Sequence, residues 1–386
     1  MKGHVRQRGG TWVFVLDLGR GSGGKRRQKW QGGFRTRKDA ERELTRVLHE
    51  LNTGAYVEPS KFTVSEYLGQ WLEHYAKTNV APKTAERYAE IVKVHLAPAL
   101  GGHPLARLQP LHIQTYYSQA LQSGRRDGQG GLSAQTVLHH HRVLREALRQ
   151  AVKWQLLARN PADAVEPPRP RRHETRTLDE EATARLLEAV KGGRLYLPVL
   201  LAATTGMRRG EILALRWQDV DLRAGTLAVR QSMEQTREGC RFKQPKTQKS
   251  RRVIALPPLA VEGLRRHKAE QAKQKLLLGP GYQDNGLVCA QPDGQPWSPG
   301  ALTNAFRYVV RRAGYPGIRF HDLRHGHASQ LLRAGIHPKV VSERLGHSTV
   351  GITLDTYSHV LPGLQEEAAR RIDTALRAAS QKIRQS

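Results

Sequence analysis

The last third of the chain carries a succession of short polar motifs that restricts its fold and chemistry more than any other stretch. FHDLRHGHAS, RLGHST and LDTYSHV follow one another within residues 320–360. His321 and Arg324 are three residues apart, so on a helix they project from the same face. His347 follows a Leu-Gly break, where a helix can end and turn a side chain back toward that face. Tyr357 comes ten residues later, ahead of another helical pattern.

A second stretch, LAATTGMRRGEILALRWQDVDL, places an arginine beside the start of a helix. An apolar run breaks at Thr205-Gly206, and helical apolar spacing resumes after Arg208. A helix N-terminus directs N–H groups and a positive dipole end toward anions, and an arginine there adds a bidentate grip on phosphate oxygens. Glu211, three residues on, either orients Arg208 or simply solvates the helix.

Together the two stretches offer positive charge, hydrogen-bond donors and one phenol, with no evident acid–base dyad or metal-ligand cluster. This set suits a phosphodiester substrate with Tyr357 as the nucleophile. Taken alone, a tyrosine is usually a packing residue and an arginine a surface cation. The catalytic interpretation depends on their occurring together and in order. We expect neither a cofactor nor a metal ion.

The order of the motifs carries a resemblance to a known family. TGMRRGE, HDLRH, LGH and DTY, over residues 204–359, resemble the tyrosine recombinase (phage integrase) family. The resemblance implies that four side chains surround a scissile phosphate, which Tyr357 attacks. The four are Arg208, His321, Arg324 and His347. Gly326 departs from the family pattern, which more often has Thr there, but it touches no catalytic position.

The family also uses a lysine on a hairpin between the two motif groups. Here KQPKTQKSRRVIALP offers Lys246, with Lys249 and Lys243 as rivals. In the implied reaction this lysine protonates the leaving 5′-oxygen, and His321 is the candidate base for the tyrosine. The product is a covalent 3′-phosphotyrosine, which a 5′-hydroxyl from another strand can attack without ATP or metal.

The resemblance implies a mainly α fold with small β-sheets, divided into three domains. These are an arm-type DNA-binding domain at 1–56, a helical core-binding (SAM-like) domain at 63–160 and, after a linker at 166–176, a mixed but mostly α catalytic domain at 174–380. The implied activity is site-specific recombination that integrates or excises a mobile element such as a prophage. The implied partners are double-stranded attachment sites, a homotetramer on DNA, a directionality factor and a DNA-bending protein.

Charge favours a nucleic-acid partner independently of any motif. Lys and Arg number 63 against 34 Asp and Glu, a net charge of +29, and the excess is spread along the chain. Because no apolar run approaches the length of a membrane-spanning helix, we expect DNA rather than a membrane as the partner. Two cysteines give neither a disulfide framework nor a zinc site. We therefore expect a cytoplasmic, nucleoid-associated protein.

The sequence of residues 1–56 predicts a small basic sheet with one helix packed against it. TWVFVLDL alternates like a strand, residues 29–31 suggest another, and Thr36 opens a helix with an apolar face. Residues 1–38 contain eleven Lys or Arg and a single Asp. Such a sheet can lay strands in a major groove, although the same charge also fits a solvated surface. The side chains expected to contact DNA, here and further along the chain, are Arg6, Arg8, Lys25, Arg26, Arg27, Lys29, Arg171, Arg172 and Arg251.

Residues 63–160 show helical periodicity throughout. Thr63 with Glu66 forms a capping box, further helices cover about 83–96 and 111–121, and Ser133 caps a fourth. The apolar and aromatic stripes are expected to be core. The adjacent residues His139, His140 and His141 face three directions on a helix, so we expect surface residues rather than a metal site.

The expected catalytic domain begins with a helix capped by Thr177 and Glu180. Strand-like segments LAV and RRVIAL flank a polar loop and form the hairpin that would carry Lys246. An amphipathic helix over 364–379 either closes its own domain or docks on a neighbour.

Two other functions compete with the recombinase. A type IB topoisomerase-like strand transferase would use the same tyrosine chemistry, but the arm-like segment at 1–56 argues against this alternative. A non-catalytic DNA-binding regulator on an integrase scaffold would be expected to have lost a catalytic position, and every position is present.

Overall fold

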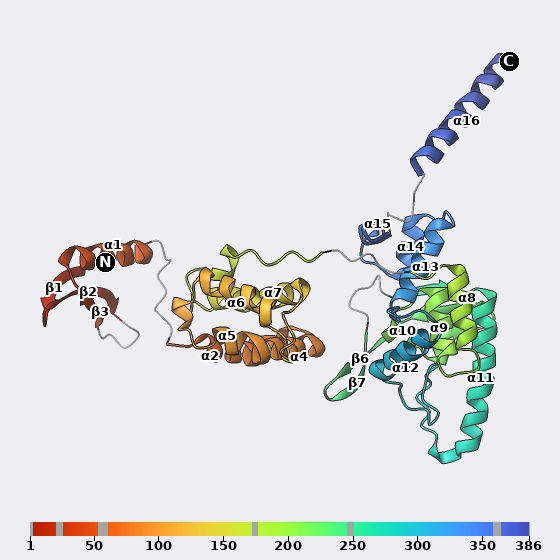
Figure 1. Ribbon diagram of the computed structural model, residues 1–386, viewed down its shortest axis with the longest axis horizontal. Coiled ribbons are helices and arrows are strands. Elements are labelled where there is room, and N and C mark those ends of the chain that lie inside the picture. Colours follow the sequence, from red (N-terminus) through yellow and green to blue (C-terminus); the bar gives the residue numbers. More distant parts are fainter. Residues whose placement is uncertain are drawn as a thin grey trace. The chain divides into compact units, whose positions relative to one another are not determined.

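The computed structural model describes residues 3–20, 26–52, 61–171, 177–244, 251–357 and 364–385. Contacts divide the chain into two compact units, residues 1–172 and 173–386 (Figure 1). Most of the described elements are helices, with small antiparallel sheets in each unit, as the sequence predicts. In the part of the chain described here, no helix combines the length and the apolar character needed to cross a bilayer.

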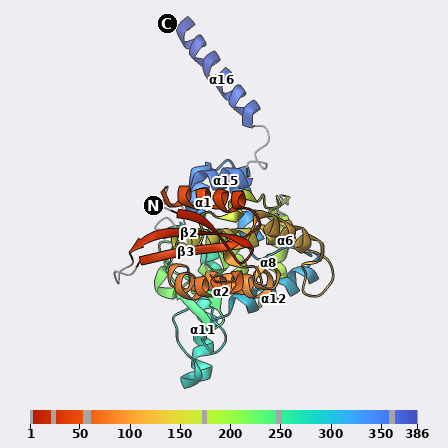
Figure 2. The same cartoon turned by 90° about the vertical axis from the view of Figure 1, so that its left-hand side faces the viewer.

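The first unit begins with a small sheet and a helix. β1 (Gly3–Arg8), β2 (Thr11–Arg20) and β3 (Arg26–Phe34) pair antiparallel in that order, and β2 and β3 lie side by side in Figure 2. α1 (Arg37–Asn52) packs Leu44 and Val47 on Phe14 and Leu16, which forms the core here. The predicted strand and helix are confirmed, whereas β1 was not predicted because its sequence is mostly polar.

The burial of β2 does not follow its alternating sequence pattern. Simple alternation in β2 would bury Phe14 and Leu16 and expose Val13 and Val15, but all four are buried. A period-two pattern distinguishes the two faces of a strand only when one of them meets water.

The rest of the first unit is helical, as predicted. α2 (Val64–Trp71) and α4 (Pro82–Ile91) each run on through a π-helical turn into a short helix, ending at Asn79 and Leu100. α6 (Pro110–Ser123) and α7 (Ala134–Lys153) complete the bundle. The capping box at Thr63 and the Ser133 cap both form, and Tyr67 and Trp71 are core residues.

The sequence predicts that the three consecutive histidines of α7 lie at the surface, and this is wrong for two of them. His139 is exposed, but His140 and His141 are buried and accept or donate hydrogen bonds to Tyr116 and Tyr117 of α6, at 2.7 and 2.8 Å. Both continue the buried stripe that also contains Val137, Leu144 and Leu148. This helical spacing was visible in the sequence, and a tyrosine hydroxyl pairs with Nδ1 of each buried imidazole, while Nε2 of His140 has no hydrogen-bond partner among the described residues.

The second unit holds the candidate site. α8 (Glu180–Ala189), α9 (Tyr196–Thr205) and α10 (Arg209–Ala214) lead into the sheet, whose order is β4 (Val220–Asp221), β5 (Thr226–Val229), β8 (Arg252–Ala255). The remaining helices are α11 (Pro258–Leu278), α12 (Pro299–Arg312), α13 (Asp322–Arg333), α14 (Pro338–Leu345), α15 (Val350–Tyr357) and α16 (Leu364–Gln385).

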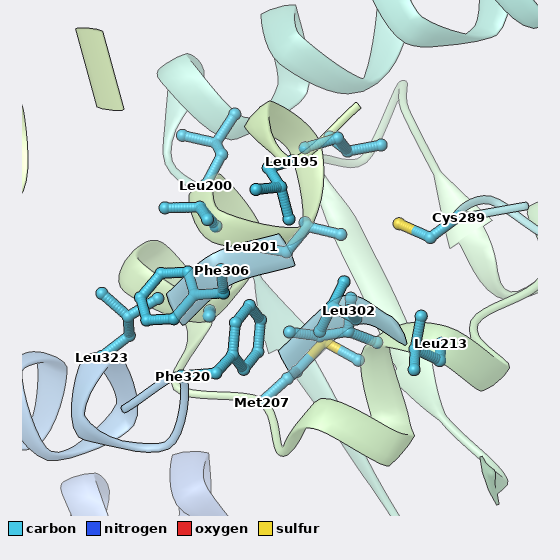
Figure 3. Packing of buried hydrophobic residues seen from close by; sticks show 14 of the residues in the cluster. Leu195, Leu200, Leu201, Met207, Leu213, Cys289, Leu302, Phe306, Phe320 and Leu323 are labelled. Atoms are coloured by element: carbon cyan, nitrogen blue, oxygen red, sulfur yellow. The ribbon is translucent and has the colours of Figure 1, made fainter. Parts of the chain in front are cut away.

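α9 runs through the centre of this unit. Leu200 and Leu201 are fully buried, and Figure 3 shows them near Phe306 of α12 and Phe320 just before α13. Helix α9 is apolar almost all round, as expected of a helix enclosed by others. Because α10 and α13 flank it, the motifs at 205–211 and 321–325 come from elements anchored on the same core.

Two sequence predictions need correction in this unit. The cap of α8 is Asp179 rather than Thr177, because the helix begins at Glu180 and the Asp179 carboxylate accepts from the Ala182 N–H at 2.7 Å. β5 and β8 pair as predicted, but the segment between them contains a further hairpin, β6 (Ser232–Thr236) with β7 (Gly239–Lys243). Lys246 lies outside the described residues.

The C-terminal helix α16 extends to Gln385, six residues beyond the predicted end. Its apolar residues Ile372, Leu376 and Ile383 are exposed. The choice between closing its own domain and docking on a neighbour stays open.

Candidate active site

The predicted catalytic side chains that the structure describes line one pocket of about 360 Å³. They are Arg208, His321, Arg324, His347 and Tyr357. Lys246 and its rival Lys249 lie outside the described residues. The other rival, Lys243, belongs to β7 and forms an ion pair with Glu234. Residues from four separate helix ends therefore meet at one place.

Two left-handed glycines produce the breaks that bring the motifs together. Gly206 ends α9 with φ 66° and Gly346 ends α14 with φ 67°, as expected of C-terminal caps. Space also requires glycine at the first position. A Cβ at Gly206 would lie 2.5 Å from Leu345 and 2.8 Å from His327, closer than van der Waals contact allows. The chain can therefore turn Arg208 and His347 into the pocket within two residues of each break.

Glu211 holds Arg208 in place, so the solvated-surface alternative is wrong. The carboxylate is 4% exposed and accepts from the Arg208 guanidinium at 2.8 Å and from the Arg208 backbone N–H at 2.9 Å. Arg252 of β8 donates to the same carboxylate at 2.9 Å and to the Arg344 carbonyl. Arg208 also donates to the Gly346 carbonyl at 3.1 Å. Its orientation is thus fixed from two sides before any ligand arrives.

Replacing Glu211 with Gln should lower both stability and activity. The change keeps the shape but removes the negative charge between two arginines, so we expect a loss of about 2 kcal/mol in the free energy of unfolding. Burial raises the pKa of Glu211, but the arginines outweigh it and the net pKa is lowered. The stabilisation is therefore present above the ordinary carboxyl pKa and lost only as pH falls through the lower folded value.

Urea unfolding at pH 7 and pH 3 would test this. The difference between Glu211→Gln and the native protein should shrink at the lower pH. An equal difference at both pH values would show that the charge is not the stabilising feature.

Arg324 is a buried cation, and one of its N–H donor groups has no acceptor among the described residues. It is 3% exposed, and one guanidinium nitrogen donates to the Gly206 carbonyl at 2.7 Å. A second guanidinium nitrogen, Nη2, is buried and has no hydrogen-bond partner among the described residues. Burial, together with the charge of Arg208, lowers the pKa of Arg324 to about 9, so the group is still charged at pH 7. An unpaired buried N–H is costly unless a ligand satisfies it.

Both predicted histidines are neutral at pH 7. Burial, reinforced by nearby cationic and imidazole groups, lowers the pKa of His321 and of His347 to about 4. The Nδ1 atom of His347 is hydrogen-bonded to the Thr353 hydroxyl at 2.8 Å. His321 occupies the N-cap position of α13, and its ring meets that of His325 edge to face at 4.9 Å between centroids. A neutral imidazole can still donate one hydrogen bond or accept one.

Tyr357 ends α15 and is buried at the edge of the pocket, with 1% exposure. Its ring packs with Ala328, Leu332, Val341 and Leu345. Its hydroxyl is 2.7 Å from Nδ1 of His325. Burial raises the pKa of Tyr357 to about 12, and the charge of Arg324 only partly opposes this. The phenol is therefore protonated at pH 7 and needs a proton acceptor to become nucleophilic.

His325 was missed in the sequence. It lies within the HDLRH motif, four residues after His321 and thus on the same helix face, which was the available signal. What the motif could not supply was the packing of α13 against α15, which brings His325 to the tyrosine. His325 also lines the pocket.

The predicted DNA-contacting residues are spread over both units. Arg6 and Arg8 are exposed on β1, with their guanidinium groups 4.1 and 5.8 Å from the Trp30 ring centre. Lys29 is half-buried on β3, and Arg171 and Arg251 are exposed. Lys25 and Arg172 lie outside the described residues, as do the side chains of Arg26 and Arg27. DNA contact by all of these stays a prediction.

Three family models match successive parts of the chain. The phage integrase family matches residues 176–363, the N-terminal SAM-like domain of phage integrases matches 63–121, and an Arm DNA-binding domain matches 4–51. A tyrosine recombinase XerC-like protein of Caldanaerobacter subterraneus is 29% identical over 93% of this chain and 95% of its own length. An integrase of Streptomyces ambofaciens is 27% identical over 95% and 94%.

Solved structures show the same fold. The Tn1549 transposon integrase in complex with a circular intermediate DNA superposes with a TM-score of 0.68 at 19% identity, over 81% of this chain and 99% of that chain. A lambda integrase tetramer bound to a Holliday junction gives a TM-score of 0.55 at 20% identity, over 89% and 95%.

Proposed function

The chain belongs to the phage integrase family, and we propose that it is a site-specific recombinase that cuts and rejoins DNA through a covalent bond to Tyr357. The observation that carries this proposal is the single pocket that joins a buried tyrosine hydroxyl to two arginines and neutral histidines. No one of these groups would distinguish a recombinase from an ordinary core.

The pocket suits a phosphodiester in the state where charge develops on it. The buried Nη2 of Arg324 and the partly exposed guanidinium of Arg208 offer N–H donors to the non-bridging oxygens. If Nδ1 of His347 accepts from Thr353, its Nε2 carries a proton and becomes a further donor. Donors fixed before reaction stabilise developing charge without reorganisation, and each contributes about 10²–10³ in rate.

In the proposed reaction the Tyr357 oxygen attacks phosphorus and displaces the 5′-oxygen. The 3′-phosphotyrosine keeps a phosphoester bond, so a 5′-hydroxyl from another strand can reverse the attack without ATP. Lys246 remains our candidate for the acid that protonates the 5′-oxygen. The proton of Tyr357 has two candidate acceptors in the pocket, His321 and His325.

We assign the remaining parts by the family matches. Residues 1–56 would bind arm-type sites, 63–160 would grip the core site and 174–380 would carry the reaction, with 166–176 as the linker. Four chains on two attachment sites would make the active assembly, as in the lambda integrase tetramer bound to a Holliday junction. A directionality factor, a DNA-bending protein and a cytoplasmic location complete the proposal. The Arm DNA-binding match at 4–51 favours a recombinase over a topoisomerase.

The test is a covalent adduct formed by the native protein. DNA from beside the chain's own gene, carrying a nick near the cleavage point so that the cut end diffuses away, is incubated with the protein in EDTA. We expect an SDS-resistant, protease-sensitive DNA adduct whose nucleotide-bearing peptide contains Tyr357. An adduct on another residue, or none on DNA that the protein binds specifically, would contradict the proposal.

A further inference from the structure

The hydroxyl of the proposed nucleophile, Tyr357, is hydrogen-bonded to His325, one of the two candidate proton acceptors in the pocket. We propose that Nδ1 of His325 accepts the phenolic proton of Tyr357 while the tyrosine oxygen bonds to phosphorus. This inference rests on the proposed function, because it concerns the same pocket and the same reaction. It makes His325, rather than His321, the general base.

The geometry supports proton transfer. Nδ1 lies 2.7 Å from the Tyr357 hydroxyl, within the range over which a general base takes a proton directly. The two ring centres are 5.7 Å apart, and both side chains line the pocket. Tyr357 therefore holds this contact without leaving the pocket, and attack would not need a new partner for its proton.

The protonation states agree with the direction of transfer. Burial lowers the pKa of His325; Asp322 opposes this, while Arg324 and Arg319 reinforce it. A neutral imidazole with its proton on Nε2 leaves Nδ1 free to accept. The titratable and charged groups around it are Arg319, His321, Asp322 and Arg324 near its own helix, Tyr357 on α15, and His347 and Arg208 across the pocket.

His321 is placed differently. Its ring packs edge to face against His325, and it lines the same pocket as the two arginines. We therefore assign His321 to the phosphate rather than to the tyrosine. The hydrogen bond of the Tyr357 hydroxyl is to His325, one helical turn further along the chain than His321.

The step balances without any other reactant. The proton moves from the Tyr357 oxygen to Nδ1 of His325, the O–P bond forms and the bond to the 5′-oxygen breaks. That oxygen keeps the electron pair and receives a proton from the acid of the proposed function, Lys246. When a 5′-hydroxyl attacks the phosphotyrosine, the now neutral Lys246 takes the proton of that hydroxyl, and the His325 imidazolium returns its proton to the departing tyrosine.

His325→Asn separates proton acceptance from hydrogen bonding. The Asn amide oxygen can accept a hydrogen bond near the position of Nδ1 but cannot take a proton at neutral pH. We expect single-turnover cleavage of a nicked substrate to fall by about 10²-fold at pH 7. Because the variant must form phenolate from a group whose pKa is about 12, its rate should rise about tenfold per pH unit from pH 6 to 9. The native rate should be flat above about pH 6.5.

His321→Asn is the matched control, since it alters the neighbouring imidazole of the same motif. It should lose rate without acquiring the steep pH dependence. Fluorescence anisotropy with the same DNA should give the native affinity for His325→Asn, and urea midpoints close to the native value should show that both variants are folded. A second substrate with sulfur in place of the 5′-bridging oxygen needs no acid, so it should not rescue His325→Asn.

Two outcomes would overturn the assignment. If His325→Asn cleaves at the native rate with the native pH profile, the hydrogen bond between His325 and Tyr357 has no part in the reaction. If the cleavage rate of His325→Asn falls by the same factor at every pH, or if the sulfur substrate restores it, His325 is not the proton acceptor. The proposed function fails separately, if the native protein forms no adduct on Tyr357.

Discussion

Tyr357→Phe should abolish covalent cleavage while leaving the folded protein almost unchanged. The substitution removes one oxygen, and that oxygen is the atom that bonds to phosphorus in the proposed reaction. Electrostatic donors in the pocket cannot replace a missing nucleophile, so we expect adduct formation to fall to the detection limit.

The reason to expect an intact fold is the packing of the ring. Phe keeps the contacts with Leu332, Val341 and Leu345, and only the hydrogen bond to His325 disappears. Such a loss costs about 0.5–1.5 kcal/mol, well below the stability of a typical domain.

Three measurements on the same preparation separate activity from stability. These are adduct formation with a nicked substrate, the urea midpoint and the affinity for the attachment-site DNA. The expected result is no adduct with a small shift in the midpoint and unchanged affinity. Persistence of the adduct would place the nucleophile on another residue, and a collapsed midpoint would mean that the loss of activity is not evidence for chemistry.

The sequence predicted the parts of this site that depend on local backbone. Gly206 and Gly346 each follow a helical run and adopt positive φ, a conformation that few other residues accept, so the positions of Arg208 and His347 could be read from the chain. The three-residue spacing of His321 and Arg324 was also readable from the sequence, although His321 is the N-cap residue of α13 and only Arg324 lies within the helix. These features involve residues within a turn of one another.

The features that were missed depend on contacts between distant segments. Glu211 could be placed near Arg208, but its second partner, Arg252, comes from a strand 41 residues later. His325 reaches Tyr357 across 32 residues, through the packing of α13 and α15. His140 and His141 lay on a recognisable stripe, yet only the tyrosines of α6 explain how they can be buried. Hydrogen-bond partners of buried polar groups are tertiary information.

Arg324→Gln should lower the cleavage rate by about 10³-fold without destabilising the free protein. Gln can still donate to the Gly206 carbonyl, which the native residue meets at 2.7 Å, but it cannot present a second N–H and a positive charge to a phosphate. In the free protein that charge is a cost, because burial and the neighbouring Arg208 both disfavour it. Removing a buried charge also removes its desolvation cost, so we expect no net loss of stability.

Arg209→Gln provides the matched control. Arg209 is next to Arg208 in the chain, but its guanidinium donates to the Pro299 carbonyl and to Thr303, and it is not among the pocket residues. We expect this variant to lose stability with little change in cleavage of bound DNA, the reverse of Arg324→Gln. Measuring the cleavage rate and the urea midpoint of both variants tests this: Arg324→Gln should change the rate and Arg209→Gln the midpoint.

A ligand titration connects the unpaired donor with the substrate. Inorganic phosphate should raise the melting temperature of the native protein, because an anion that binds only the folded state stabilises it by mass action. The increase should be retained in Arg209→Gln and lost in Arg324→Gln. An equal increase in all three proteins would mean that phosphate binds elsewhere on this strongly basic chain, and the buried Nη2 of Arg324 would then need another explanation. A selective loss would show that the free protein keeps a destabilising charge in place for the phosphate it acts on.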